Sequence, residues 1–215
     1  MTLIASIRCD DGIVIAADSQ ETITDPNGNS YRRSVQKISP FSLPTVKAVV
    51  AGGGNGNLID AFIVKFRRHL EATPISSIGQ FVGETEAALA KFYVNDVAAC
   101  PDKDKEIDLV IGAYVPGSKE YNVWRSAYAA LVPVEDRQPI LVGWEEDIYY
   151  RTIDRLCFLG MTLPQAILAS IYTLIVAEDT SNYVRGPMSV VLLSRNGVFE
   201  EPPEEIKRKA DCLAG

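Results

Sequence analysis

The sequence predicts an α+β protein, a four-layer αββα sandwich in which two stacked, mainly antiparallel sheets are flanked by helix pairs. Segments with strand-like alternation and segments with helical spacing follow one another in the order strands, two helices, strands, two helices, strands. The 215 residues contain 47% hydrophobic and 23% charged residues, enough to bury a sizeable core. Because no repeat and no linker divides the chain, we expect a single domain over residues 1–215. An α+β arrangement whose sheets are not stacked is the alternative that these patterns leave open.

The first half of the chain opens with a predicted hairpin. Apolar residues alternate after Thr2, an Asp-Gly turn follows, and a second apolar run ends at Asp18. Residues 19–36 are polar and rich in turn formers, which predicts a long loop. Strands are then expected from Lys37 and over 45–51, followed by amphipathic helices over 58–70 and 77–97.

The second half repeats this alternation after the charged residues 102–106. Thr162 and Gln165 have the spacing of a capping box and mark the start of a helix. We expect strands at 107–114, 121–125, 128–133, 139–142 and 190–193, helices over 145–159 and 163–179, and a solvated terminal helix after Glu200.

The charge and the apolar runs limit the classes of partner. The 21 basic and 28 acidic residues give a net charge of −7, which argues against nucleic acid or an anionic membrane surface as the main partner. No apolar run reaches the roughly 20 residues of a membrane span, and no signal region follows Met1. We therefore expect a cytoplasmic protein without a membrane partner. The four cysteines have no CxxC spacing and are expected to be free thiols.

The single histidine limits the chemistry. His69 lies in a helical, basic stretch, where a solvated side chain is expected rather than a catalytic base. Metal sites built on several imidazoles are excluded, whereas a carboxylate-only magnesium or calcium site stays open. The glycine run 52–56 lacks both the GxGxxG order and a Walker lysine, so phosphate binding is not expected. The sequence calls for no cofactor.

Four positions carry a resemblance to a known family. Thr2 begins a strand, Asp18 ends the next, Lys37-Ile38 begins the third, and Ala51-Gly52-Gly53 ends the fourth. This order and spacing resembles the proteasome β-subunit superfamily of N-terminal-nucleophile hydrolases, including its bacterial relative Anbu. The resemblance covers about the first 70 residues in detail, and only the architecture afterwards.

The resemblance implies a role for each of these residues. Thr2 becomes the nucleophile if Met1 is removed, with its own α-amine as the base. Lys37 would lower the pKa of that amine by like-charge repulsion, and Asp18 would keep the lysine charged and oriented. The oxyanion donor would be the backbone N–H of Gly53, or otherwise that of Gly52.

The second half departs from the family pattern. Active members carry a Ser-Gly element before the third helix, whereas residues 141–146 contain no serine. Members also carry an aspartate followed three residues later by Ser-Gly. Asp179 matches that aspartate, but Asn182 fills the serine position, or Val184 if the alignment is anchored on Gly186. The support of the terminal amine therefore differs from that of the family.

The family resemblance implies a threonine-type peptidase that hydrolyses peptide bonds. Its partners would be copies of itself in a ring or related assembly, a polypeptide substrate and an ATP-driven unfoldase. A catalytically inactive scaffold or assembly subunit is the first alternative, favoured by the missing serine and by any retention of Met1. An amidase acting on a small amide is the second, because the same fold serves both reactions.

Overall fold

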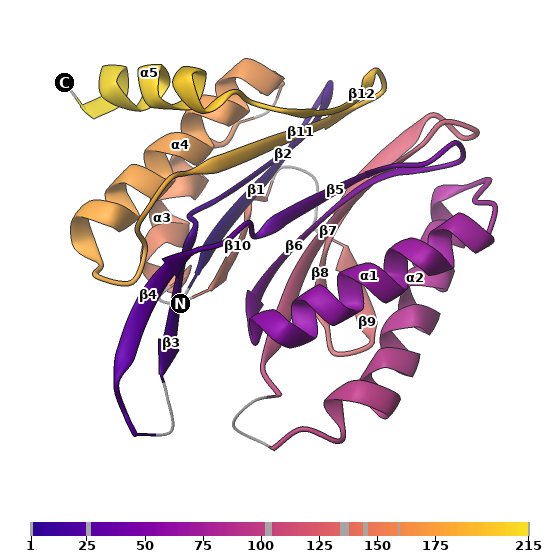
Figure 1. Cartoon of the computed structure of the whole chain (residues 1–215). Helices are drawn as coiled ribbons and strands as arrows, with labels where there is room; N and C mark the ends of the chain where they lie inside the picture. The colour runs from indigo at the N-terminus through magenta and orange to yellow at the C-terminus, as the bar shows by residue number, and fades with distance from the viewer. Residues whose placement is uncertain are drawn as a thin grey trace.

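The computed structural model describes residues 2–24, 27–101, 105–133, 138–143, 146–158 and 160–214. Two five-stranded antiparallel sheets stack face to face, with helices on both outer faces (Figure 1). The four-layer fold class predicted from the sequence is confirmed. One sheet has the order β10 (Ile140–Gly143), β1 (Leu3–Cys9), β2 (Gly12–Ala17), β11 (Ser189–Ser194) and β12 (Gly197–Glu200). The other has the order β5 (Ile38–Ser42), β6 (Lys47–Gly54), β7 (Ile107–Val115), β8 (Glu120–Ala127) and β9 (Ala130–Pro133).

The helices begin at polar side chains that accept backbone N–H groups. The Asn55 side chain accepts from the N–H groups of Asn57 and Leu58 at the start of α1, and Ser77 caps α2 in the same way. Thr162 and Gln165 form the predicted capping box. The helices are α1 (Gly56–Ala72), α2 (Ile78–Phe92), the π-helix η1 (Tyr93–Val97), α3 (Glu146–Leu156), α4 (Leu163–Thr180) and α5 (Pro203–Ala214).

Three apolar layers hold the sandwich together. The layer between the sheets includes Ile13, Val49 and Val110, all fully buried. Strand β2 is buried at all six positions, because the other sheet covers one of its faces and α4 contacts the strand on the other side. The layer under α1 and α2 is rich in aromatic residues, and the layer under α3, α4 and α5 is mainly aliphatic. The C-terminal helix was expected to be solvated, but its Ile206 is buried in that third layer.

The predicted loop over 19–36 is wrong, because this segment forms the hairpin β3 (Gln20–Thr24) and β4 (Ser30–Ser34). All five residues of β4 are exposed, so the hairpin has no buried apolar face and shows no hydrophobic alternation in the sequence. Asp25 and Pro26 of the expected turn lie outside the described residues. Strand β12 was also not predicted, since only one of its four residues is buried.

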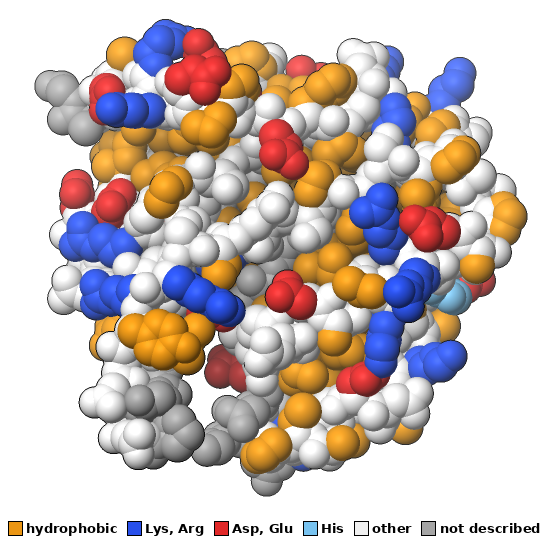
Figure 2. Space-filling model, in the orientation of Figure 1, with side chains coloured by type: hydrophobic (Ala, Val, Ile, Leu, Met, Phe, Trp, Pro, Cys, Tyr) orange, Lys and Arg blue, Asp and Glu red, His pale blue; other side chains and the backbone are white. Residues whose placement is uncertain are grey.

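The surface is mixed in charge despite the net negative balance. Basic side chains gather over α1 on the face seen in Figure 2, where the helix carries Lys65, Arg67 and Arg68. Within the described part of the chain, no helix has the length and apolar character to span a membrane.

Candidate active site

Thr2 lies at the entrance to β1, where its neighbour Leu3 is held by contacts from two other segments. The N–H of Leu3 donates to Oδ1 of Asp18 at 2.9 Å, and Leu3 pairs with Gly143 at the end of β10. Gly143 has a φ of 130°, and a β carbon there would lie 1.8 Å from the carbonyl oxygen of Thr2. Only glycine therefore lets β10 approach the backbone of Thr2 so closely.

Lys37 and Asp18 form a buried ion pair. The Nζ atom of Lys37 lies 2.8 Å from Oδ1 of Asp18, and the two side chains are only 5% and 2% exposed. The same Nζ donates to the carbonyl oxygen of Gln20 at 2.6 Å. Burial lowers the pKa of Lys37, while the negative charge of Asp18 acts in the opposite direction. The lysine is thus fixed in position and gives up its proton more easily than a solvated lysine.

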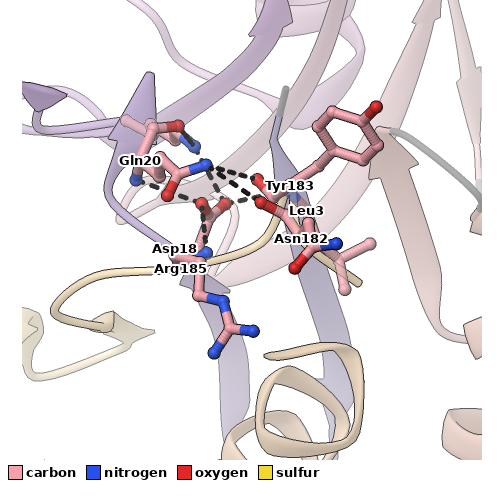
Figure 3. A network of polar contacts seen from close by, with 7 residues as sticks. Leu3, Asp18, Gln20, Asn182, Tyr183 and Arg185 are labelled. Carbon is pink, nitrogen blue, oxygen red and sulfur yellow. Dashed lines mark hydrogen bonds and ion pairs between the residues drawn. The ribbon is translucent and has the colours of Figure 1, made fainter. Parts of the chain in front are cut away.

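Asp18 is fixed by main-chain donors from three segments of the chain (Figure 3). Its Oδ1 accepts from Leu3, and its Oδ2 accepts from the N–H groups of Gln20 at 3.1 Å and Arg185 at 3.5 Å. Gln20 in turn donates through Nε2 to the carbonyl oxygens of Asn182 and Tyr183. The loop after α4 is thereby attached to the carboxylate that holds Lys37.

Thr2 and Lys37 line one cavity of about 120 Å³, together with Gly52 and Gly54 of β6. Its other charged lining residues are Glu21 and Arg33 of the β3–β4 hairpin and Asp60 of α1. Cavities of about 680 and 430 Å³ lie elsewhere and are not lined by Thr2, so size does not identify the candidate site. We assign the candidate site to the small cavity because a threonine hydroxyl and a buried lysine, Thr2 and Lys37, line it together.

The glycines at the end of β6 come close to Thr2. A β carbon built on Gly53 would lie 3.8 Å from Cβ of Thr2, so this strand faces the threonine directly. The N–H of Gly52 donates to the carbonyl oxygen of Lys37 at 3.3 Å. That donor already has an acceptor, and Gly53 is itself paired in the sheet with Asp108 of β7, so both glycines stay candidates for the oxyanion donor.

The structure does not bring Asp179 to this group. Its side chain is exposed near the end of α4 and makes no hydrogen bond or ion pair with any residue the structure describes. The following loop contributes main-chain atoms instead: the N–H of Arg185 and the carbonyl groups of Asn182 and Tyr183. No side-chain pattern in the sequence could have indicated these contacts. Met1, Trp144 and Glu145 lie outside the described residues.

The side chains that could bind a metal ion do not add to the candidate site. His69 on α1 contacts Glu84 at 2.9 Å and is about one-third exposed. Among the residues with a described position, no group of three or more His, Cys, Asp or Glu side chains could hold a metal ion.

Comparisons with known proteins bear on the fold. No protein-family model matches the sequence, and no curated protein matches it. Similar solved structures include Anbu, the ancestral β-subunit, from Yersinia bercovieri, with 14% identity, a TM-score of 0.79, and coverage of 99% of this chain and 93% of that one. Anbu from Hyphomicrobium sp. strain MC1 has 14% identity, a TM-score of 0.80 and coverage of 99% and 93%. The helical assembly of the Anbu complex from Pseudomonas aeruginosa has 13% identity, a TM-score of 0.75 and coverage of 98% and 92%. The chain therefore has, over nearly its whole length, the fold of the ancestral β-subunit Anbu.

Proposed function

We propose that the protein is a threonine-type N-terminal-nucleophile peptidase, which hydrolyses peptide bonds with Thr2 once Met1 has been removed. The observation that carries this proposal is the buried pair of Lys37 and Asp18, whose lysine lines the same cavity as Thr2. Burying two opposite charges gives little net stability, so a pair whose lysine lines the same cavity as a threonine favours a chemical role.

The proposed reaction uses the hydroxyl and the amine of one residue. Oγ1 of Thr2 attacks the scissile carbonyl carbon while the α-amine takes the hydroxyl proton. The negative charge that develops on the carbonyl oxygen is stabilised by the N–H of Gly53. The C–N bond then breaks, the amine returns the proton to the leaving nitrogen, and an ester remains on Thr2. A water molecule, deprotonated by the same amine, hydrolyses the ester.

Lys37 would adjust the base of this reaction. A free α-amine titrates at about pH 7.7–8.0, so part of it is neutral at physiological pH. A positive charge at Lys37 disfavours protonation of the α-amine and so increases the fraction of the amine that is neutral. Asp18 holds the ammonium in place through the 2.8 Å contact. In this proposal Asp18 orients Lys37, and the positive charge of Lys37 acts on the α-amine of Thr2.

The partners follow from the same proposal. The similar Pseudomonas aeruginosa structure is a helical assembly, which supports a homo-oligomer here, in a ring or a related arrangement. We place a polypeptide substrate at Thr2 and an ATP-driven unfoldase as a further partner. The described cysteines are all unpaired, which supports a reducing, cytoplasmic location.

A non-catalytic scaffold is the second candidate, and the exposed position of Asp179 favours it, because the α-amine then lacks a supporting carboxylate from α4. An amidase acting on a small amide is the third, and the small volume of about 120 Å³ favours it. These two candidates predict different outcomes in the experiment below.

The test combines intact mass of protein from its native host with labelling by a peptide epoxyketone, which reacts with a threonine hydroxyl and a free α-amine together. Loss of Met1 and labelling that disappears in Thr2→Ala are expected. Thr22→Ala is the matched control, because Thr22 lines the same cavity and should label like the wild type. A full-length mass without labelling would refute the peptidase and leave the scaffold. Hydrolysis of small amides, with no cleavage of peptides, would support the amidase.

A further inference from the structure

The groove between α1 and α2 has an aromatic base and a basic rim. Its volume is about 430 Å³, and we call it the helix groove. Phe62, Phe66 and Phe92 form part of its lining, and each ring is at most 2% exposed. The rings of Phe62 and Phe66 stack with their centroids 5.2 Å apart. The base of the groove is therefore apolar and well packed.

Two cations of the rim have no partner. Arg68 of α1 and Lys91 of α2 line the groove, are exposed, and make no ion pair or hydrogen bond with any residue that the structure describes. Lys65, a third cation of the rim, is neutralised by Asp96. Because Arg68 and Lys91 belong to different helices, the groove is where their free charges come together. An occupant with two negative charges would satisfy both.

The chain departs from regular helix geometry beside the groove. α2 continues as the π-helix η1, which contributes Asn95 and Asp96 to the lining. The neighbouring Val94 is 73% exposed, although it is a large apolar residue. π-helical turns are rare and are frequently found at functional sites. This turn therefore supports a role for the groove beyond the packing of two helices.

The chain also contains an acidic segment whose charges complement the groove. Residues 200–205 read Glu-Glu-Pro-Pro-Glu-Glu and join β12 to α5, and we call them the acidic segment. Two of the four carboxylates are neutralised by cations of α5. The other two, Glu200 and Glu204, are exposed and pair with nothing in the described ranges of the chain. The adjacent Phe199 is 50% exposed. The two prolines restrict the segment, so little freedom is lost when it binds.

The groove and the acidic segment lie on different layers of the sandwich. α1 and α2 cover the β5–β9 sheet, whereas α5 packs with α4 over the other sheet (Figure 1). One copy therefore cannot bring its own segment into its own groove. The complementary surfaces can meet only between two copies, and such a contact joins two different surfaces.

We propose that the helix groove of one copy binds the acidic segment of a second copy, so that copies associate head to tail. Arg68 and Lys91 would pair with Glu200 and Glu204, and Phe199 would supply an apolar contact. Each pair of copies keeps one free groove and one free segment, so the contact repeats until a ring closes or a filament grows. This contact rests on the homo-oligomer of the proposed function and is independent of the peptidase.

The test measures self-association at low salt by analytical ultracentrifugation. The groove variant is Arg68→Gln with Lys91→Gln, and the segment variant is Glu200→Gln with Glu204→Gln. Each should weaken self-association at least about tenfold, because the paired charges are lost. The matched controls Arg67→Gln on α1 and Asp211→Asn on α5 change exposed charges outside the groove lining and the acidic segment, and should associate like the wild type. Circular dichroism checks that all variants are folded.

A mixture of the two variants tests the head-to-tail geometry. The groove variant keeps its acidic segment, and the segment variant keeps its groove. The mixture should therefore form one-to-one pairs that grow no further.

Three results would overturn the proposal in different ways. If the wild type forms oligomers and either variant associates equally well, or if the mixed variants do not pair, the contact is wrong and the homo-oligomer stands. If the wild type is monomeric at its highest soluble concentration, both fail. If that monomer binds a polyglutamate peptide and the groove variant does not, the occupant is a different acidic partner. Labelling of Thr2 tests the peptidase separately.

Discussion

Asp18→Asn tests how much stability the fold loses when the buried charge of Lys37 is left without its partner. The substitution removes the carboxylate that Nζ of Lys37 contacts at 2.8 Å. Both side chains are almost fully buried, so water cannot replace the lost charge. Removing one partner of such a pair costs about 3–5 kcal/mol. That is a large part of the roughly 5–15 kcal/mol that stabilises a typical domain.

The free energy of unfolding is measured by urea denaturation, followed by circular dichroism and by tryptophan fluorescence. Asp96→Asn is the matched control, because Asp96 pairs with Lys65 at 2.6 Å but the lysine side chain is 55% exposed. That surface pair should contribute less than about 1 kcal/mol. Asp18→Asn combined with Lys37→Met should cost less than the sum of the single changes, since no buried charge is left unpaired. A loss in Asp18→Asn no larger than in Asp96→Asn would refute the reasoning.

Three further predictions concern single positions. Gly143→Ala should displace Thr2 and abolish epoxyketone labelling with circular dichroism retained, because the new β carbon would lie 1.8 Å from the Thr2 carbonyl oxygen. Burial lowers the pKa of Lys37, so between that pKa and the ordinary lysine value the unfolded chain binds more protons. The free energy of unfolding should therefore rise with pH in that window, and urea titrations of Lys37→Met should show a smaller rise. Burial raises the pKa of Cys9 to about 12, so iodoacetamide should modify the exposed Cys212 first in native protein, as mass spectrometry would show. Equal modification of both cysteines would contradict this order.

The parts of the fold that the sequence predicted are those with a buried face. The apolar run of β2 and the helical spacing of α1 and α4 left clear patterns, because burial selects apolar residues at fixed intervals. The hairpin β3–β4 left none, since its strands pair with each other and not with either main sheet. Backbone hydrogen bonds hold the hairpin, and such bonds place little demand on residue type.

The candidate site also combines features that the sequence indicated with features that it did not. The positions of Asp18 and Lys37 could be predicted from strand ends and spacing, and the structure pairs these side chains. The contribution of the loop after α4 could not be predicted, because the N–H of Arg185 and the carbonyl groups of Asn182 and Tyr183 are present in any sequence. Asp179 was matched by its place in the chain, and its exposed side chain lies apart from the pair.

The attachment of Leu3 has a consequence for entropy. Chain ends usually move freely, and a freely moving nucleophile must be ordered again in every reaction. Here the N–H of Leu3 is bound to Asp18 and Leu3 is paired with Gly143, so the residue that carries the proposed nucleophile is attached to a strand with neighbours on both sides. The freedom of this part of the backbone is lost once, when the sandwich folds, so in the proposed reaction the main chain beside Thr2 would not have to be ordered again for each substrate.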